Sequence, residues 1–469
     1  MKNIVLFNSG TFWIMFILFI ALYALVCKRK TQMMLYVAAF GLLFYYLNNG
    51  FMFCLLLFTA FYDFIIARKI YKSSDPKKKK LWLTLSICLS LSILCYFKYT
   101  NFFISMLSSN FAPLDIFLPA GISFYTFQTI SYAVDVYKGK VEPARSFLQY
   151  LFYISFFPLI LAGPIMRAGK FFAQIKDNKV IDKTMIYGGL WLIITGLLKK
   201  AVFADYIAQY NNWVFDAPLN YSGFEGLMAI LGYTAQIYCD FSGYSDISIG
   251  MASIMGFDLG VNFRLPYQSV NLTEFWRRWH ISLSSWMRDY IYIPLGGNRK
   301  SKFRMYVNNM ITMLIAGLWH GASWQFIYWG GMHGVGLIVH KLNKPWLDKI
   351  PDTWTVKAVS TVLTFVFVAF LWIFFRASTM ENALDLIKHT VSDFDIAYIV
   401  PFFKARTMWC VFIILIYLLH GLRETFLVKV KMAFISSHWT VKALIFLIIV
   451  QLIIQFDSGE IQPFIYYSF

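Results

Sequence analysis

Residues 305–339 read MYVNNMITMLIAGLWHGASWQFIYWGGMHGVGLIV and contain no Asp, Glu, Lys or Arg. A membrane-spanning helix needs about 20 mostly apolar residues, so this run is long enough for two segments that break near Gly321. The whole chain of 469 residues has the same character, with 59% hydrophobic, 20% aromatic and only 14% charged residues. A soluble domain has about 45–50% apolar and about 25% charged residues. The composition therefore excludes a soluble fold and predicts an all-α polytopic membrane protein.

Other apolar runs extend this pattern along the chain. They occupy residues 11–27, 33–47, 51–67, 81–97, 147–165, 185–203, 356–375, 408–420 and 441–455. Several are shorter than a full span, so we expect about ten to twelve helical elements, some crossing the membrane and some re-entrant. Because we see no internal repeat and no long linker, we predict a single integral membrane domain over residues 1–469.

The net charge of +18 comes from 42 Lys and Arg against 24 Asp and Glu. The basic residues gather in gaps between apolar runs, at residues 28–30, 77–80 and 299–300. Such clusters are typical of the cytoplasmic loops of membrane proteins. The aromatic residues lie in the apolar runs instead, which argues against nucleic acid as a partner and leaves the lipid bilayer. The six cysteines are scattered without a CxxC pair, so neither disulfides nor a metal site are expected.

Polar residues inside apolar regions are the candidates for function, because burying them in lipid is costly. Asp240 and Asp246 lie six residues apart in such a region. They either line a polar cavity or pair with arginines such as Arg264 or Arg277, and we favour the pairing because an unpaired buried carboxylate is expensive.

The segment 274–290 shows helical periodicity, which predicts one amphipathic helix with Asn271 or Thr273 as its N-cap. One face carries Trp276, Trp279, Leu283, Trp286, Met287 and Tyr290, and a neighbouring stripe carries Arg277, His280, Ser284 and Arg288. A helix lying in the membrane interface, with arginines reaching lipid phosphates, explains the arginines and tryptophans. It leaves His280 unexplained.

His320 lies deep in the apolar run quoted above, between Gly317 and Gly321, whose spacing lets a neighbouring backbone approach closely. A histidine at such a depth is a candidate for function. It can take a proton from an attacking hydroxyl or be acylated itself. The sequence contains no GxSxG, HExxH or Walker A motif. His333 is balanced between a core and a functional role, whereas His340, His389, His420 and His438 are expected at interfaces or in loops.

Several motifs together resemble those of the membrane-bound O-acyltransferase family. They are FWRRWHISL at 275–283, RDY at 288–290, IPLGGNR at 293–299, LWHG at 318–321, LPAGISFYTFQ at 118–128 with DVY at 135–137, AGP at 162–164 and FIYY at 464–467. The motif-bearing core is about 118–340. The chain most resembles the bacterial polysaccharide branch that includes alginate O-acetyltransferases. The end of the chain departs from the family, since Tyr466-Tyr467-Ser468-Phe469 replaces the usual Tyr-Phe-Gln-Phe.

This resemblance implies a ring of helices around a central funnel in the bacterial cytoplasmic (inner) membrane. It maps the family's invariant histidine onto His320 and a second conserved polar position onto His280. It also implies acetyl-CoA as the donor substrate, no tightly bound cofactor and no metal. The acetyl group would pass to a periplasmic or extracellular SGNH-type transferase, which works with the polysaccharide machinery.

The resulting hypothesis is a membrane O-acetyltransferase. His320 acts as acid and base or as transient acyl acceptor, and His280 is its polar partner. Arg277 and Arg288 contact donor phosphates, and the further candidates for substrate binding are Ser284, Trp319, Asp240 and Asp246. D-alanyl transfer and peptidoglycan acetylation remain alternatives within the enzyme class. A proton-coupled transporter or flippase and a structural scaffold are the alternatives outside it.

Overall fold

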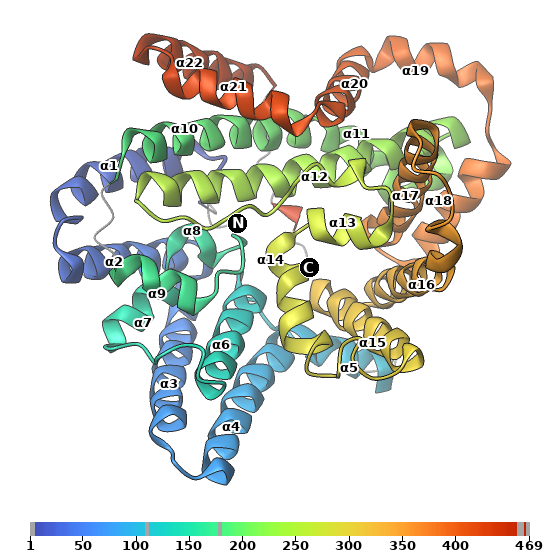
Figure 1. The fold of residues 1–469 in the computed structure, drawn as a ribbon. Helices are drawn as coiled ribbons and strands as arrows, with labels where there is room; N and C mark the ends of the chain where they lie inside the picture. The colour runs from blue at the N-terminus through green and yellow to red at the C-terminus, as the bar shows by residue number, and fades with distance from the viewer. Residues whose placement is uncertain (1–4, 108–111, 177–180, 457–463, 466–469) are drawn as a thin grey trace. The chain divides into compact units, whose positions relative to one another are not determined.

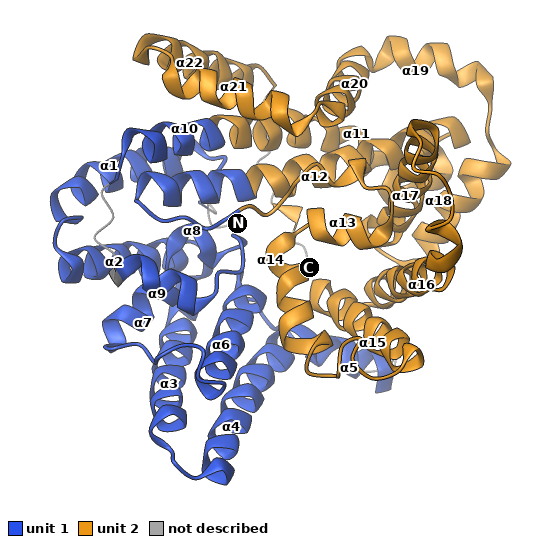
Figure 2. Ribbon diagram, in the orientation of Figure 1, with its two compact units in different colours: residues 1–193, 245–260 blue, residues 194–244, 261–469 orange. Residues whose placement is uncertain are grey.

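The computed structural model describes residues 5–107, 112–176, 181–456 and 464–465, and within these ranges every regular element is helical (Figure 1). The prediction of an all-α protein is therefore confirmed. The chain forms two compact units (Figure 2). Unit 1 comprises residues 1–193 and 245–260, and unit 2 comprises residues 194–244 and 261–469. The organisation as a single domain stays a prediction.

Unit 1 consists mainly of the N-terminal helices. They are α1 (Gly10–Val26), α2 (Lys30–Asn49), α3 (Phe53–Lys72), α4 (Pro76–Leu94), α5 (Thr100–Leu107), α6 (Ile122–Tyr137), α7 (Phe147–Ile154), α8 (Phe157–Ile160), α9 (Ala168–Lys176) and most of α10 (Lys183–Leu197). The apolar run at 147–165 is thus broken into two short helices. Pro158 in the first turn of α8 accounts for the break, because proline suits a helix start and not a helix interior.

Unit 2 contains the helices that follow. They are α11 (Asp205–Asp216), most of α12 (Gly223–Ile254), α13 (Leu272–Arg278), α14 (Ile281–Met287), α15 (Lys302–His320), α16 (Trp324–Leu347), α17 (Trp354–Arg376), α18 (Met380–Ser392), α19 (Ile399–Ala405), α20 (Thr407–Gly421), α21 (Glu424–Ser436) and α22 (Trp439–Phe456). With 32 residues, α12 was not among the predicted apolar runs because polar residues interrupt it.

Side-chain caps fix several helix starts. Ser9, Asp75, Ser301 and Thr353 each accept a hydrogen bond from a backbone N–H in the first turn of the helix that follows. Such a cap satisfies one of the four N–H groups that have no partner within the helix. The caps therefore mark the starts of these helices, and α4 and α15 begin with basic residues ahead of their apolar runs.

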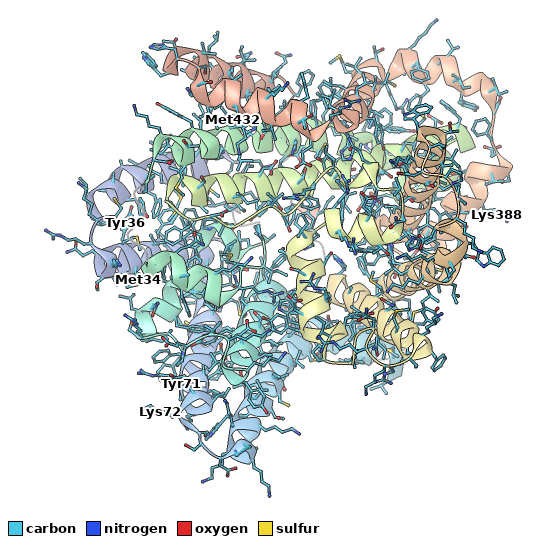
Figure 3. All side chains as sticks on the ribbon, viewed as in Figure 1. Met34, Tyr36, Tyr71, Lys72, Lys388 and Met432 are labelled. Atoms are coloured by element: carbon cyan, nitrogen blue, oxygen red, sulfur yellow. The ribbon has the colours of Figure 1, made fainter. Side chains whose placement is uncertain are left out.

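Among the described residues, five helical segments are long and apolar enough to cross a membrane, and the count is six if a bent pair forms one span. The five are Lys30–Lys72, Pro76–Leu107, Lys183–Asp216, Trp354–Arg376 and Trp439–Phe456, and the bent pair is Ile396–Ala405 with Thr407–Gly421, at 94°. Lys30–Lys72 turns at Gly50, which has a φ of +59°. Tyr71 and Lys72, in its last turn (Figure 3), are exposed.

The run 305–339 forms two helices that break near Gly321, as predicted, and the two helices pack against each other. Helix α15 ends at His320 and α16 begins at Trp324. A Cβ atom added to Gly317 would overlap the carbonyl oxygen of Phe326, and one added to Gly330 would overlap that of Met313. The two helices are thus in backbone contact, which only glycine permits at these positions.

Candidate active site

His320 is the last residue of α15, and its side chain is buried, with only 2% of its surface exposed. Its imidazole packs edge-on against three aromatic rings. The ring centres lie 4.9 Å away for Trp319, 5.0 Å for Trp329 and 5.1 Å for Phe375. A shell of this kind excludes water and lowers the local dielectric, which strengthens any polar interaction made by the imidazole.

His280 is fully buried, and its backbone corrects the prediction of one helix over 274–290. The helix ends before His280, whose φ of +42° is left-handed, and a new helix starts after it. Asn262 causes the restart: its carbonyl oxygen accepts the N–H of Ile281 at 2.9 Å, and its side-chain oxygen accepts the N–H of Ser282 at 3.1 Å. The same side-chain oxygen lies 3.3 Å from Nδ1 of His280. The predicted cap Asn271 is confirmed by its bond to the N–H of Glu274.

Trp319 packs near both histidines. Its ring centre lies 6.2 Å from that of His280 and 4.9 Å from that of His320. On other sides His280 meets Phe241 at 4.5 Å and Phe263 at 6.3 Å. The structure thus brings His280, Trp319 and His320 into one aromatic cluster of unit 2.

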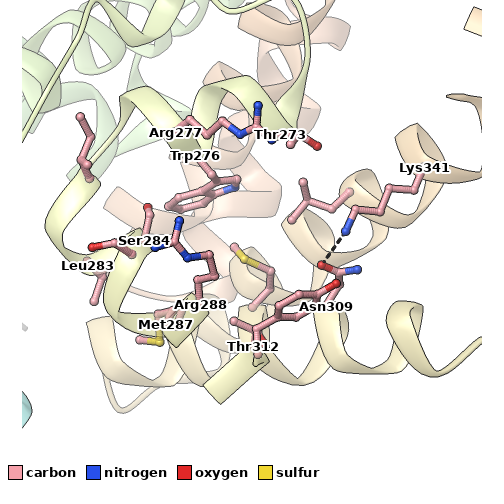
Figure 4. A pocket seen from close by; sticks show the side chains of 16 residues that line it. Thr273, Trp276, Arg277, Leu283, Ser284, Met287, Arg288, Asn309, Thr312 and Lys341 are labelled. Atoms are coloured by element: carbon pink, nitrogen blue, oxygen red, sulfur yellow. Dashed lines mark hydrogen bonds between the residues drawn. The ribbon is translucent and has the colours of Figure 1, made fainter. Parts of the chain in front are cut away.

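A cavity of about 400 Å³ opens beside this cluster, between α13, α14, the π-helical turn Arg288–Tyr292, α15 and α16 (Figure 4). It is lined by Thr273, Trp276, Arg277, Ile281, Leu283, Ser284, Ser285, Met287, Arg288, Tyr292, Asn309, Thr312, Met313, Ala316, Leu337 and Lys341. These lining residues include three cationic side chains and no carboxylate. The predicted stripe residues Arg277, Ser284 and Arg288 meet here although their helix is broken. A cavity of this charge suits an anionic ligand.

One face of α15 connects the cavity with His320. Asn309, Thr312, Met313 and Ala316 line the cavity, and His320 occupies the next position on the same face. It lies about 6 Å further along the helix axis than Ala316, at a rise of 1.5 Å per residue. His320 is not itself a lining residue. The wall of the cavity thus leads toward the buried imidazole.

Trp276 and Trp329 supply a second connection that the sequence did not single out. Trp276 lines the cavity and packs against Trp329 at 5.7 Å, and Trp329 packs against His320. His333 is fully buried among the same aromatic rings, 4.8 Å from Trp329 and 5.0 Å from Trp276. From the sequence, Trp276 was explained by an interfacial helix and Trp329 was not singled out, so only the packing of the helices reveals this connection.

Asp240 is paired, but with a lysine and not with the arginines that we expected. Lys200 forms ion pairs with Asp240 and, at 2.8 Å, with Asp205, and its side chain is almost completely buried. The other carboxylate oxygen of Asp240 accepts the backbone N–H of Ile465 at 3.1 Å. Asp246 belongs to unit 1, and neither Asp240 nor Asp246 lines the cavity. Their assignment as binding residues stays a prediction that this geometry does not favour.

His420, expected at an interface or in a loop, is instead buried, and its Nε2 accepts the backbone N–H of Tyr267 at 3.0 Å. In the part of the chain that the structure describes, no group of three or more His, Cys, Asp or Glu residues could hold a metal ion. Tyr466-Tyr467-Ser468-Phe469, where the sequence departs from the family, lies outside the described residues.

Comparison with known proteins shows which family this chain belongs to. The profile described as the membrane-bound O-acyltransferase family matches residues 143–383. Peptidoglycan O-acetyltransferase of Helicobacter pylori is 35% identical over 422 residues, covering 83% of this chain and 80% of that protein. Probable alginate O-acetylase AlgI of Pseudomonas putida is 34% identical over 493 residues, covering 99% and 100%. Teichoic acid D-alanyltransferase of Bacillus subtilis is 29% identical over 295 residues, covering 60% and 74%.

Within its described residues the chain is helical, has five segments long and apolar enough to cross a membrane, and holds a buried histidine near a cationic cavity. Together with these relatives, this arrangement defines a membrane-bound enzyme of acyl transfer. The chain belongs to the membrane-bound O-acyltransferase family. It is an acyltransferase embedded in a membrane, as the motifs predicted.

Proposed function

We propose that this enzyme transfers an acetyl group from acetyl-CoA toward the hydroxyl groups of an extracytoplasmic polysaccharide. The observation that carries the proposal is the cationic cavity whose wall, on α15, leads to His320. The names of the relatives from H. pylori and P. putida support acetyl as the group and a polysaccharide as the acceptor. We further propose a bacterial inner-membrane location and a separate SGNH-type transferase that completes the transfer outside the cytoplasm.

The donor would bind in the cavity through its phosphates. Arg277 and Arg288 both line the cavity. Arg288 donates its Nε–H to Oδ1 of Asp289 at 2.8 Å, so its two terminal amino groups, and the fork of Arg277, are the N–H donors that would meet phosphate oxygens. The hydroxyl of Ser284 lies on the same wall and can donate to an amide or phosphate oxygen of the donor. The absence of carboxylates among the lining residues avoids repulsion of the phosphates.

His320 would perform the chemistry by one of two routes. In the first, it takes the proton of the attacking hydroxyl, the new ester bond forms as the C–S bond breaks, and the proton then passes to the thiolate of CoA. In the second, a ring nitrogen attacks the thioester carbonyl, the C–S bond breaks, and the departing CoA thiolate takes up the proton of the ring. The hydroxyl then attacks the acetylated imidazole, the N–C bond breaks as the ester forms, and the proton of the hydroxyl returns to the ring. Both routes need His320 neutral at the start and screened from water, as its aromatic shell provides.

His280 and Trp319 would hold the imidazole of His320 in place without contacting the substrate. His280 is held by the oxygen of Asn262 and by its unusual backbone conformation, and Trp319 packs against both imidazole rings. Backbone strain of this kind persists where the surrounding structure requires it, often at functional sites. No tightly bound cofactor and no metal enters either route.

The test is cleavage of the donor thioester by the full chain in lipid nanodiscs. Acetyl-labelled acetyl-CoA is supplied with the partner transferase, and CoA release is followed for wild type, His320→Ala and His280→Ala. His438→Ala is the matched control, because that side chain is exposed. We expect cleavage by wild type and the control, and a loss of at least about 100-fold for His320→Ala. Equal rates for wild type and His320→Ala would refute the role of His320.

D-alanyl transfer is the second candidate, favoured by the similarity to the D-alanyltransferase of B. subtilis. It predicts that acetyl-CoA is not cleaved and that a D-alanyl thioester carried by a protein is cleaved. A transporter or flippase would cut no thioester with either donor.

A further inference from the structure

A third cation faces the cavity in a setting unlike that of the two arginines. Lys341 on α16 is half-buried, whereas Arg277 and Arg288 are exposed. The Nζ atom of Lys341 donates a hydrogen bond to Oδ1 of Asn309 at 3.0 Å (Figure 4). It also lies 5.6 Å from the centre of the Tyr292 ring. A neutral oxygen and an aromatic face thus surround this ammonium group.

Asn309 fixes the direction of the lysine. Its Nδ2 donates to the carbonyl oxygen of Met305 in the same helix at 2.7 Å, which turns its Oδ1 toward Lys341. An ammonium group has three N–H donors, and Asn309 uses one of them. The structure shows no ion pair for Lys341 within its described residues, and burial lowers the pKa of the ammonium. An anion in the cavity would offset this cost of burial.

The length of α15 between Asn309, which binds Lys341, and His320 limits which anionic ligands can reach both residues. Asn309 and His320 are eleven residues apart on α15, which corresponds to about 16 Å along the helix axis. The wall between them, at Thr312, Met313 and Ala316, carries no charge. A ligand that follows this wall from Lys341 to His320 would have its charge far from its reacting acyl group, with a neutral arm between. Arg277 and Arg288 line the cavity from α13 and the π-helical turn, not from this wall. In acetyl-CoA the pantetheine arm separates the phosphates from the thioester in this way.

We propose that Lys341, oriented by Asn309, is a specificity-determining residue that binds a phosphate of a nucleotide-bearing thioester donor. This inference rests on the proposed function and deepens it, because it assigns the phosphate end of the donor to Lys341 and Asn309. The acyl end then lies toward His320. A thioester without phosphates gains nothing from Lys341.

The kinetic test compares two donors on the full chain in nanodiscs, acetyl-CoA and S-acetylpantetheine, which has no phosphate. Lys341→Met keeps the length of the side chain and removes its charge, and Lys341→Arg keeps the charge. Lys344→Met is the matched control, since Lys344 lies on the same helix, is exposed and does not line the cavity. We expect Lys341→Met to raise the KM for acetyl-CoA about tenfold or more, since charge-assisted hydrogen bonds are the strong ones. The KM for S-acetylpantetheine should stay unchanged.

A second variant tests whether a folding defect, and not the lost charge, explains the effect of Lys341→Met. Asn309→Asp places a carboxylate beside the ammonium, where it competes with the phosphate and leaves the lysine in place. We expect it to raise the KM for acetyl-CoA about tenfold as well, with no effect on S-acetylpantetheine. Equal rises for both donors in both variants would show a structural role and overturn the proposal.

Direct binding separates this inference from the proposed reaction. Adenosine 3′,5′-bisphosphate, which has no thiol arm, is titrated calorimetrically into the same proteins. Weaker binding by Lys341→Met but not by Lys344→Met supports the phosphate site even if wild type cuts no thioester, in which case only the proposed function fails. Equal binding by wild type and Lys341→Met, or no binding by either, overturns the phosphate site itself.

Discussion

The buried ion cluster of Lys200, Asp205 and Asp240 gives a sharp test of whether Asp240 serves structure or substrate. Lys200 has 4% of its side-chain surface exposed and Asp240 has 3%. Asp240→Asn removes one of the two carboxylates that balance the buried ammonium. Breaking a buried pair costs about 3–5 kcal/mol, and we expect the lower end, about 3 kcal/mol of unfolding free energy, because Asp205 remains.

Lys200→Met should cost a similar amount, because it leaves Asp240 without a counter-charge. Asp240→Leu alone should also cost about 3 kcal/mol, because it too leaves Lys200 with Asp205 as its described partner. If the losses from Lys200→Met and Asp240→Leu were independent, the double variant would cost about 6 kcal/mol. Apolar groups that replace a whole buried pair are often nearly neutral, so we expect the double variant to lose only about 1–2 kcal/mol. Asp205, with 14% of its side-chain surface exposed, keeps some access to water in that variant. The coupling between the two positions is then about 4 kcal/mol.

The assay is unfolding of the purified chain in mixed micelles by denaturing detergent, followed by tryptophan fluorescence. The control is Asp352→Asn, which breaks an exposed ion pair with Lys357 and should change little. The double variant should also retain thioester cleavage. Wild-type stability in Asp240→Asn, combined with loss of cleavage, would refute the structural assignment and place Asp240 at the substrate.

Three further outcomes follow from the packing of unit 2. Gly317→Val should cost about 3 kcal/mol or more and reduce the yield of monodisperse protein, because its side chain overlaps α16, whereas Gly331→Ala meets only ordinary contact and should be tolerated. His280→Asn should keep the thermal midpoint close to wild type, since asparagine adopts left-handed backbone readily, and His280→Val should lose about 1–3 kcal/mol more; equal midpoints would contradict the strain. Trp329→Phe should fold but lower thioester cleavage about tenfold, because it removes the indole between Trp276 and His320; an unchanged rate would show that this indole only fills space.

The sequence predicted the fold better than it predicted the site. Apolar run length identified the helical membrane protein. The glycines beside His320 predicted a close backbone approach, which the structure shows between Gly317 and Phe326 of α16. The break at His280 could not be read from periodicity, because it is imposed by Asn262 from a separate segment of the chain. Lys341 was missed for a related reason, since only the packing of α16 on α15 brings it to Asn309.

His320 lies at the carboxyl end of α15, and this position favours the positive charge that the proposed reaction places on its imidazole. A neutral imidazole that accepts a proton becomes a cation, and a dry aromatic shell alone would oppose that charge. The carboxyl end of a helix carries partial negative charge, and a cationic side chain there is stabilised by about 0.3–1 kcal/mol, and by up to about 2 kcal/mol where it is partly buried. His320 is the last of the nineteen residues of α15, so this favourable field acts where the charge develops. The shell keeps water from the thioester, and the helix end offsets part of the cost of charging the imidazole in the absence of water.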